Sequence, residues 1–390
     1  MTSAETPTQA LHRLQLFVVD RALPLWASAG FDEANGCFHE RLEFSGETSR
    51  EAPQRLLVQA RQIVVYSRAA LIGWNGSGKA LALRAFEGLE RRYLSPDENP
   101  GWIFSVDPAG SPMDKTRDLY SHAFVLYMLA WLYRLSGDKS FLLLADRTLS
   151  DIDRIFASGD GRGLLSKVPG PTNLREQNPH MHLFEALLAL AEASGEARYL
   201  DRATALVDLF DVALADPATG TVREVFDANW KPDRAAGENQ VEPGHQLEWA
   251  WLLREWERLA GSNVDQRVGR LVAHAISYGI DREKGLVRSI VKESGAVVSG
   301  ASRVWPQTEA IRALCREDAA GKSWPNLVGT ITERLFRAHL PGHLNGGWID
   351  QIDEDGGPMV KFMPASSLYH IVGAAIDGTA QVSAIKGELA

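Results

Sequence analysis

Apolar residues recur along most of the chain at intervals of three and four positions, which is the spacing of one face of an α-helix. Helix pairs such as 117–136 and 138–157 are joined by a short Ser-Gly-Asp turn, the pattern of a helical hairpin. The chain is therefore predicted to be all-α. The periodicity predicts about twelve helices, over residues 5–28, 54–72, 77–93, 117–136, 138–157, 178–194, 196–213, 242–260, 262–280, 303–317, 321–339 and 363–377.

Longer segments rich in Gly, Asp and β-forming residues separate the helix pairs. Each such segment begins at a glycine, and these glycines are 57 to 65 residues apart: Gly36, Gly101, Gly163, Gly220, Gly285 and Gly347. Six units of two helices and one short hairpin predict a closed (α/α)6 barrel, with six inner helices, six outer helices and the long connections on one rim. An open helical solenoid is the alternative, and closure is favoured because no polar capping repeat is evident. No linker divides the chain, so we expect a single domain over 1–390.

The stretch GWNGSGKA, Gly73 to Ala80, fits the phosphate-loop pattern G-x-x-x-x-G-K except at its last position. A nucleotide-binding loop carries Ser or Thr where this chain has Ala80, and it follows a strand. The preceding stretch QRLLVQARQIVVYSRAALI is too long for one strand and has helical periodicity. We therefore expect a turn between two helices and set aside an NTPase site.

Composition excludes several classes of partner. The net charge is −9 and the pI about 5.6, and no long basic run is evident, so we expect no nucleic acid and no anionic membrane as a main partner. The apolar run from Ala123 to Tyr133 is too short to cross a bilayer, and the N-terminus lacks the pattern of a secretory signal. Cys37 and Cys315 are expected to be free thiols in a reducing compartment, which predicts a cytoplasmic protein. Eleven tryptophans are many for this length, and indole rings can stack on sugars as well as fill a core.

Candidate chemistry begins in VEPGHQLEWAWLL. His245 and Glu248 are three positions apart and share a helix face, with Trp251 one turn further on. A carboxylate beside an imidazole raises its basicity and can orient it. The alternative is a capped helix whose histidine only satisfies a backbone group.

Two further clusters lie in REQNPHMHLFEALLAL and RVWPQTEAIRA. His180 and His182 are two positions apart and point to different sides of a helix, so at most one faces a given pocket and a metal site from this pair is not expected. Trp305 and Glu309 are four positions apart and share a face, which places a stacking platform beside an acid.

The remaining candidates stand in three short stretches. In MPASSLYHIV, Pro364 is expected to begin a helix with His370 about two turns in. In QARQ, Arg61 interrupts an apolar helix, and a buried arginine needs a ligand oxygen or a carboxylate as partner. DLYSHAF adds Asp118 and His122 with less specificity.

The candidates occupy every second predicted helix. A ring of twelve helices places alternate helices inside, so these polar side chains are expected to converge on one central cavity. They are Arg61, His122, His182, His245, Glu248, Trp305, Glu309 and His370.

Five motifs together point to a known family. QARQ, NPHMHLFEALLAL, EPGHQLEWAWLL, WPQTEAIRA and PASSLYHI, in this order between about Leu23 and Ile371, resemble the N-acylglucosamine 2-epimerase superfamily, which includes acylglucosamine and cellobiose 2-epimerases and mannose isomerases. The resemblance implies an (α/α)6 barrel, a monomer or homodimer, and a reaction on a reducing sugar with no cofactor and no metal. It implies site residues at Arg61, His182, His245, Glu248, Trp251, Trp305, Glu309 and His370.

The resemblance also implies roles for these residues. His370 would move the C2 proton of the ring-opened sugar and leave a cis-enediol, while Arg61 stabilises negative charge on oxygen. His245 would assist ring opening and, in an epimerase, serve as the acid on the opposite face, with Glu248 supporting it. Return of the proton to C1 gives a ketose, whereas delivery to the other face of C2 gives the epimer. Both outcomes use the same two histidines.

EPGHQLEWAWLL and WPQTEA resemble the mannose isomerases and acylglucosamine epimerases more than the cellobiose epimerases, and GFDEANGCFHERLEFSGE favours the mannose isomerases. We therefore predict interconversion of D-mannose and D-fructose. The alternatives are a 2-epimerase of N-acylglucosamine or glucose, and a mannose-6-phosphate isomerase. A glycoside hydrolase would need two opposed carboxylates, for which Asp118, Glu248 and Glu309 are candidates. A sugar-binding protein without activity is the last alternative.

Overall fold

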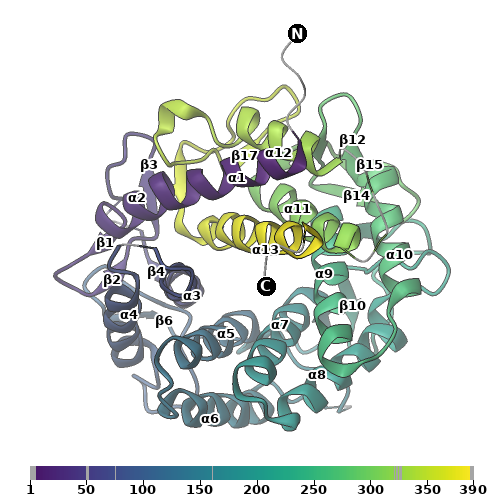
Figure 1. The fold of residues 1–390 in the computed structure, drawn as a ribbon. Helices are drawn as coiled ribbons and strands as arrows, with labels where there is room; N and C mark the ends of the chain where they lie inside the picture. Colours follow the sequence, from purple (N-terminus) through teal and green to yellow (C-terminus); the bar gives the residue numbers. More distant parts are fainter. Residues whose placement is uncertain are drawn as a thin grey trace.

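Six helices form a closed inner ring in the computed structural model, which describes residues 6–49, 52–74, 76–159, 161–319, 321, 324 and 327–386. They are α3 (Leu56–Leu71), α5 (Leu119–Ser136), α7 (Gln177–Ser194), α9 (Pro243–Ala260), α11 (Val304–Ala319) and α13 (Leu368–Lys386). Each packs against the next, and α13 packs against α3, so the ring has no free edge (Figure 1). The open solenoid is thereby excluded.

Outer helices cover the inner ring. Each inner helix packs against one of them: α4 (Gly78–Tyr93), α6 (Ser140–Ile155), α8 (Ala197–Leu209), α10 (Asp265–His274) and α12 (Leu327–Ala338), and for α13 the N-terminal helix α1 (Pro7–Phe17). Helix α1 continues through the π-helical turn η1 (Val18–Ala22) into α2 (Leu23–Ser28), and α8 and α10 continue into η2 (Phe210–Leu214) and η3 (Ala275–Gly279). The outer helices lie at the periphery of the view in Figure 1. The predicted (α/α)6 barrel is confirmed.

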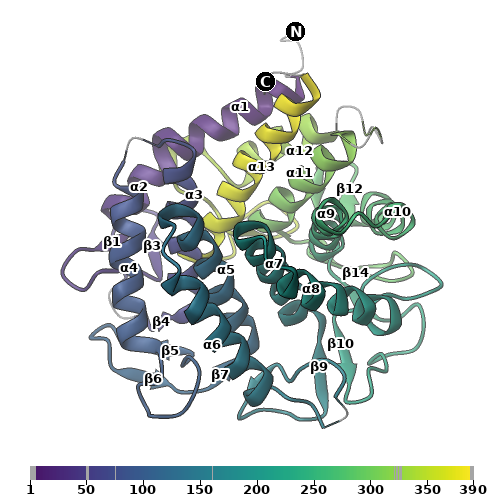
Figure 2. The same ribbon diagram turned by 60° about the horizontal axis from the view of Figure 1, so that its bottom comes forward.

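Short antiparallel strands connect neighbouring repeats toward one end of the barrel, away from the two chain ends in Figure 2. The strand before each inner helix pairs with a strand in the connection that leads to the next inner helix around the ring. The six pairs are β4 (Gln54–Arg55) with β5 (Ser105–Val106), β7 (Arg117–Asp118) with β8 (Lys167–Val168), β9 (Leu174–Glu176) with β10 (Val225–Asp227), β11 (Gln240–Val241) with β14 (Ile290–Lys292), β16 (Ser302–Arg303) with β17 (Gln351–Ile352), and β18 (Phe362–Pro364) with β3 (Arg41–Glu43). The last pair joins the sixth repeat to the first.

The other short elements extend this pattern. Strands β6 (Pro112–Asp114) and β15 (Val297–Ser299) add a third strand to two of the pairs, and β1 (Phe31–Asp32) with β2 (Cys37–Phe38) and β12 (Ile280–Asp281) with β13 (Leu286–Val287) form separate hairpins. Two 3-10 turns lie in the connection between α12 and α13: η4 (Gly342–Leu344) before β17, and η5 (Ala365–Ser367) directly after β18.

The repeating glycines hold a turn that other residues rarely adopt. Five of them, at 36, 101, 163, 220 and 285, have φ between 61° and 82°, and in the sixth repeat the neighbouring Gly346 has φ 100°. The left-handed region is open to glycine at little cost because glycine has no Cβ. The sequence repeat therefore records a turn that each connection makes before its strand.

One polar side chain in each of five inner helices fastens that turn. The fourth residue of α3, α5, α7, α9 and α11, here called the anchor position, is always Gln or His and accepts a hydrogen bond of 2.8–3.0 Å from a backbone N–H one or two residues after the turn glycine. The anchors are Gln59, His122, His180, Gln246 and Gln307. In the sixth repeat Leu368 stands at the equivalent place, four residues after the end of β18.

Several predicted helix starts were too early. The helix predicted over 363–377 begins at Leu368 and continues to Lys386, because Phe362–Pro364 pairs with β3 and Ala365–Ser367 forms a 3-10 turn. His370 thus lies in the first turn of α13 and not two turns in. The same error recurs at 54–72 and 117–136, where the first two residues are strands β4 and β7.

Several sequence predictions are confirmed. The stretch from Gly73 is a turn between α3 and α4, with Gly73 at φ 80°, and it follows a helix and not a strand; residue 75 lies outside the described residues. Cys37 and Cys315 are buried free thiols. Within the described part of the chain, no helix is both long and apolar enough to cross a membrane.

Candidate active site

A ring of side chains faces the barrel axis two residues after each anchor position, and it is called the first layer here. Its members are Arg61, Phe124, His182, Glu248, Glu309 and His370. The guanidinium carbon of Arg61 lies 4.2 Å from the ring centre of Phe124, which in turn lies 4.6 Å from the imidazole of His182. One side of the first layer is therefore cationic and aromatic.

The other side of the first layer is acidic. His182 Nε2 lies 4.0 Å from Glu248 Oε1, and one donor atom each of Glu248, Glu309 and His370 lie within 4.8 Å of one another. Five of the six residues were predicted as site residues, and the structure brings these five together. The prediction that alternate helices face inward explains why.

His245 and Trp305 lie directly beside the first layer, because they precede the anchors of α9 and α11 by one and two residues. The indole of Trp305 is 4.9 Å from the ring centre of His245 and 5.7 Å from that of His370. The three rings keep exposed fractions of 5–8%, whereas Glu309 and Glu248 are at most 1% exposed. The rings thus form the more accessible surface of the site and the acids lie beneath it.

Gly244 lets Trp305 take this place. A Cβ at Gly244 would lie 2.5 Å from the indole of Trp305, closer than real Cβ contacts come. The glycine of the GHQLE motif therefore serves packing against the neighbouring inner helix.

His245 is bound by an acid that sequence reasoning missed. Its Nδ1 donates to Glu224 Oε2 at 2.9 Å, and Gln177 Nε2 donates to the same carboxylate oxygen at 2.9 Å. Although burial opposes the charged form, the carboxylates of Glu224 and Glu242 raise the pKa of His245 to about 10. His245 is therefore an imidazolium at neutral pH. Contrary to expectation, its hydrogen-bonded carboxylate is Glu224 and not Glu248.

No motif marks Glu224, which stands immediately before β10 in a segment interpreted only as a hairpin. The pairing of β10 with β9 places Val225 opposite Glu176, directly before α7. Only this register shows that Glu224 reaches the beginning of α7 and α9.

His370 differs from His245 in its charge. Its Nδ1 lies 2.7 Å from Glu309 Oε1, and Arg312 Nη1 donates to Glu309 Oε2 at 2.8 Å. Burial, followed by the positive charge of Arg61 and the nearby imidazole of His182, lowers the pKa of His370 well below its ordinary value. His370 is therefore a neutral imidazole at neutral pH.

A third histidine, His182, also bonds a glutamate. His182 Nδ1 lies 3.0 Å from Glu185 Oε2, and Tyr369 Oη donates to the other oxygen of Glu185. Burial lowers the pKa of His182. Burial also opposes ionisation of Glu185, but His182, the charge of Arg312 and the hydrogen bond from Tyr369 together outweigh it and lower the pKa of Glu185 to about 2.

Glu248 is the unpaired acid of the first layer. Its Oε1 has no hydrogen-bond partner among the described residues, and it is 1% exposed. Burial, together with the nearby Glu309 and Glu185, raises its pKa well above the ordinary value. A carboxylic acid that keeps its proton can donate a hydrogen bond to an oxygen of a ligand.

Arg61 lies between aromatic rings with part of its guanidinium unused. Its Nη2 donates to Tyr120 Oη at 2.6 Å and its Nη1 to the carbonyl of Ser366 at 3.4 Å, while Nε has no partner among the described residues. The guanidinium carbon is also 5.1 Å from the ring of Tyr369, the neighbour of His370 in sequence. An oxyanion formed next to His370 would therefore meet a positive charge.

The structure does not bring His122 and Asp118 into this cluster. His122 is an anchor: its Nε2 accepts from Trp102 N at 3.0 Å, and its Nδ1 bonds the carbonyl of Asp118 at 2.8 Å. Both ring nitrogens are thus occupied by backbone, and burial lowers the pKa of His122 to about 4. Asp118 caps α5 by accepting from Ser121 N and Oγ. Both side chains thus carry structural bonds outside the first layer, and their binding of substrate stays a prediction that the geometry does not support.

His180 and Trp251 also have structural neighbours. His180 is the anchor of α7, so the prediction that it and His182 point to different sides is confirmed. Trp251 lies one helical turn below Glu248, with the guanidinium of Arg312 at 3.7 Å from its ring. Its ring is therefore covered by Arg312 and does not adjoin His245.

Among the described residues, three groups of side chains place donor atoms as close as metal ligands would be. Their members are His182, Glu185 and Glu248; Glu224, Glu242 and His245; and Glu248, Glu309 and His370. In each group the histidine Nδ1 already bonds a glutamate. The expectation of a reaction without metal or cofactor stays a prediction.

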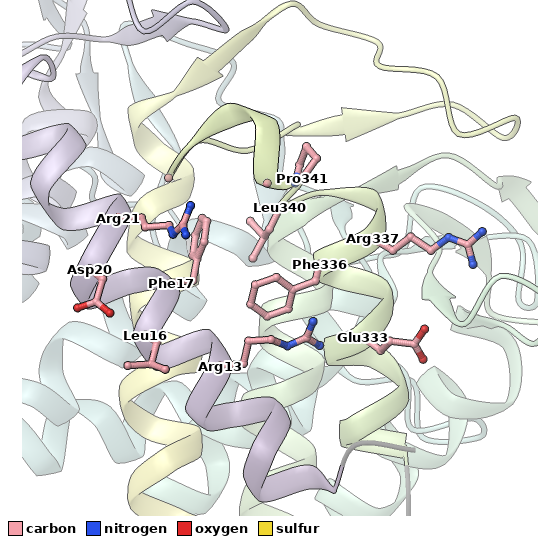
Figure 3. Close-up of a pocket in the computed structure, with 12 residues that line it drawn as sticks. Arg13, Leu16, Phe17, Asp20, Arg21, Glu333, Phe336, Arg337, Leu340 and Pro341 are labelled. Atoms are coloured by element: carbon pink, nitrogen blue, oxygen red, sulfur yellow. The ribbon is translucent and has the colours of Figure 1, made fainter. Parts of the chain in front are cut away.

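A hollow of about 710 Å³ on the outer wall is separate from this site. It lies between α1 and α12, where Phe17 and Phe336 meet edge to face and Arg337 borders the opening (Figure 3). Its lining includes no first-layer residue among the described part of the chain.

The chain is similar to characterised sugar enzymes over nearly its whole length. It matches the sequence profile of the N-acylglucosamine 2-epimerase (GlcNAc 2-epimerase) family over residues 36–374. It is 31% identical over 367 residues to the mannose-6-phosphate isomerase of Rhizobium meliloti (strain 1021), covering 90% of this chain and 92% of that protein. It is 28% identical over 326 residues to the D-mannose isomerase of Thermobifida fusca, covering 78% of each.

Solved structures share the fold. A D-mannose isomerase superposes with a TM-score of 0.84 at 21% identity, covering 95% of this chain and 97% of that one. The cellobiose 2-epimerase of Bacillus thermoamylovorans B4167 gives a TM-score of 0.84 at 19% identity, covering 95% and 99%. The extent of the family match and the identity to its members establish that the chain belongs to the N-acylglucosamine 2-epimerase family and is a sugar isomerase or epimerase.

Proposed function

We propose that the protein interconverts D-mannose and D-fructose by proton transfer through a cis-enediol. One observation carries this proposal: two histidines, one neutral and one cationic, flank the same indole. His370 is neutral and can accept a proton, whereas His245 is cationic and can donate one. Trp305 between them offers an apolar surface on which a sugar can stack.

In the proposed reaction, His245 first assists opening of the sugar ring. His370 Nε2 then takes the proton from C2 of the open-chain aldose. The electron pair of the C–H bond forms the C1–C2 double bond, and the carbonyl oxygen at C1 gains negative charge that Arg61 stabilises and a proton from His245 neutralises. When His370 returns its proton to C1, the hydroxyl at C2 loses its proton to His245 and becomes the ketone of D-fructose.

The charge of the site favours a neutral sugar over a sugar phosphate. Arg312 is already paired with Glu309 and His245 with Glu224, whereas Arg61 keeps one guanidinium nitrogen without a partner among the described residues. A phosphate dianion would therefore find few unpaired cationic groups here. Mannose 6-phosphate remains the second candidate substrate because the relative from Rhizobium meliloti (strain 1021) bears that name and is 31% identical.

A 2-epimerase is the second candidate reaction. It would use the same two histidines, with His245 delivering a proton to the opposite face of C2. Glycoside hydrolysis has less support, since it needs two free carboxyl groups. Glu309 is bound by His370 and Arg312, and Asp118 caps α5.

Proton NMR in D2O tests the proposal. Purified protein with D-mannose should give D-fructose, with deuterium entering at the transferred position to the extent that the bound proton exchanges. His370→Asn should abolish both product and exchange. His180→Gln serves as the matched control, because His180 is a buried histidine outside the site and Gln occupies the anchor position in three other repeats.

Other outcomes move the proposal within the family or end it. Glucose without fructose would identify a 2-epimerase. Turnover of mannose 6-phosphate or N-acetylmannosamine but not mannose would replace the substrate and keep the mechanism. Inertness towards all three would contradict the proposed function. Activity that is lost on extensive chelation and restored by a divalent metal would contradict the prediction of a metal-free reaction.

The proposal includes a monosaccharide as the only small-molecule partner and a single domain over 1–390 that acts in the cytoplasm as a monomer or homodimer. Light scattering of the purified protein checks the last point, since a mass near 43 kDa or twice that is expected.

A further inference from the structure

Charged side chains continue beneath the first layer through the barrel. Residues five and nine positions after the anchors form two further rings along the inner helices, here called the second and third layers. Arg312 lies in the second layer, and Arg68 and Asp377 lie in the third. Arg312 Nε donates to Asp377 Oδ2 at 3.0 Å, and Arg68 Nη2 donates to Asp377 Oδ1. Since Arg312 also donates to Glu309, the four side chains form one continuous chain that ends at His370.

The chain is buried and its charges alternate. The exposed fraction of the side chain is 0% for Glu309, 1% for Arg312, 5% for Arg68 and 18% for Asp377. Two carboxylates and two guanidinium groups cancel in formal charge. Buried ion pairs contribute little to stability when compared with apolar packing, because removing charges from water is costly. A chain of four that ends on one histidine therefore calls for a function besides stability.

We propose that Arg312 and Asp377 are positioning residues for His370, and that the chain Arg68–Asp377–Arg312–Glu309 keeps its imidazole neutral and directs Nε2 towards the substrate. This inference rests on the proposed function of His370 as the base. It assigns a role to two side chains that do not touch the sugar and act on His370 through Glu309.

Hydrogen bonding supplies the orientation. Arg312 occupies Glu309 Oε2 at 2.8 Å and leaves Oε1 for His370 Nδ1 at 2.7 Å. A carboxylate can only accept, so Nδ1 carries the proton and Nε2 keeps its lone pair. Burial raises the pKa of Glu309, and the charge of Arg312 opposes that rise. Arg312 thus helps to keep Glu309 ionised, and an ionised carboxylate fixes this tautomer of His370.

Charge balance supplies the neutrality. A histidine beside uncompensated glutamates becomes a cation, as His245 does beside Glu224 and Glu242. His370 bonds its glutamate at a similar distance, but Arg312 offsets the charge of Glu309. The charged and titratable groups that act on His370 come from every inner helix packed around it, and they are Arg61 on α3, His182 and Glu185 on α7, Glu248 on α9, and Glu309 and Arg312 on α11. Of these, only Arg312 is tied to Asp377.

The far end of the chain reaches another surface. Asp377 and Arg68 line a hollow of about 700 Å³ near the C-terminal ends of α3, α5, α7 and α9, together with Trp131 and Trp251. The chain of four charged side chains therefore runs from His370 at one end of the barrel to the opposite opening. Asp377 can be substituted without changing a residue of the first layer.

Two substitutions with opposite charge effects test the inference. Arg312→Gln leaves a net negative chain, so the pKa of His370 should rise by about one unit or more. Asp377→Asn leaves a net positive chain, so the same pKa should fall. The base works only when neutral, and the acid limb of kcat/KM should therefore move to higher pH in the first variant and to lower pH in the second. A merely structural role would not move the two profiles in opposite directions.

The pKa of His370 is read directly by NMR of the protein labelled with 15N-histidine and assigned with His370→Asn. This measurement needs no substrate. If D-mannose is not converted but the two pKa shifts appear, the proposed function fails and the positioning chain stands. If D-mannose is converted and both variants keep the wild-type pKa and pH profile, the inference is overturned.

Glu317→Gln is the matched control. Glu317 and Arg254 form an equally buried pair between α9 and α11, with Arg254 Nε 2.6 Å from Glu317 Oε1, but the pair does not lead to His370. It should lower stability without moving the pKa of His370. Should Arg312→Gln fail to fold, Arg312→Lys keeps the charge and should keep the wild-type profile more nearly, while Asp377→Asn still decides the outcome.

Discussion

His245 and His370 each bind a glutamate through Nδ1, at 2.9 and 2.7 Å, and yet they carry different charges. Besides His245, Glu224 bonds neutral Gln177 and the backbone N–H of Glu242, whose own carboxylate is close by. Glu309 instead shares its charge with Arg312. The second group bonded to each glutamate thus influences whether the buried imidazole beside it is protonated.

This difference gives the site an acid and a base from the same side-chain type. The pKa of an isolated imidazole lies near neutrality, where it performs both tasks poorly. Raising one pKa and lowering the other separates the tasks, and pairs of titratable groups whose environments push their pKa values apart mark acid and base assignments in other enzymes.

The largest effect is expected from His370→Asn. Asparagine retains a polar side chain near Glu309 but cannot accept the C2 proton, so kcat should fall by about a thousandfold or more. Exchange of the C2 proton of D-mannose with D2O measures this step without requiring product release. Exchange at a rate near that of the wild type would mean that another group is the base, and the comparison of the two pairs would lose its catalytic meaning.

Glu224→Gln should reduce the difference between the pKa values of the two histidines by changing that of His245. Loss of the carboxylate lowers the pKa of His245 from about 10 towards its ordinary value. His245 is an acid only when protonated, so the alkaline limb of the rate profile should move to lower pH, with a loss of about tenfold to a hundredfold at pH 9. Rates across pH 6–10 measure the shift. An unchanged alkaline limb would show that His245 does not act as an acid.

A geometric change should have a smaller effect. In Gly244→Ala the new Cβ would approach the indole of Trp305 to 2.5 Å and push it away from His245 and His370. We expect a loss of about tenfold in kcat/KM, arising mostly in KM, and about 1–3 kcal/mol in stability. Steady-state kinetics and thermal unfolding measure the two effects. Gly269→Ala on the outer helix α10 is the control, because nothing lies within 4 Å of its Cβ.

His122→Gln should leave activity within about twofold, because Gln fills the same anchor position in three repeats. His122 has a pKa of about 4 when folded and an ordinary pKa of 6.5. The unfolded chain therefore binds its proton first as pH falls, and this residue destabilises the fold between about pH 6.5 and 4. Chemical denaturation should show a shallower loss of stability over this range in the variant. A large loss of activity would return His122 to the site.

Periodicity and the glycine repeat were sufficient to predict the barrel, because inner and outer helices alternate regularly along the chain. The convergence of Arg61, His182, Glu248, Glu309 and His370 followed from the same alternation. The helix starts were misplaced because two-residue strands leave almost no period-2 signal, and their pairing depends on partners a full repeat away.

The errors within the site had a signal that sequence reasoning did not use. Aligning the repeats at Gln59, Gln246 and Gln307 would have shown His122 at an anchor and not in the first layer. Glu224 had no such signal, since its reach depends on strand register. The different charges of His245 and His370 depend on second partners that only the three-dimensional arrangement reveals.

The pairing of β3 with β18 has a consequence for how the protein is made. It joins Arg41–Glu43 to Phe362–Pro364, so the ring closes only when segments about three hundred residues apart meet. Contacts of such separation form late, because a long loop must close before they bring any stabilisation. The base of the reaction is on the helix that directly follows β18. During synthesis, five repeats can therefore emerge and begin to pack before His370 has left the ribosome. The protein gains its activity in the same step in which the ring closes.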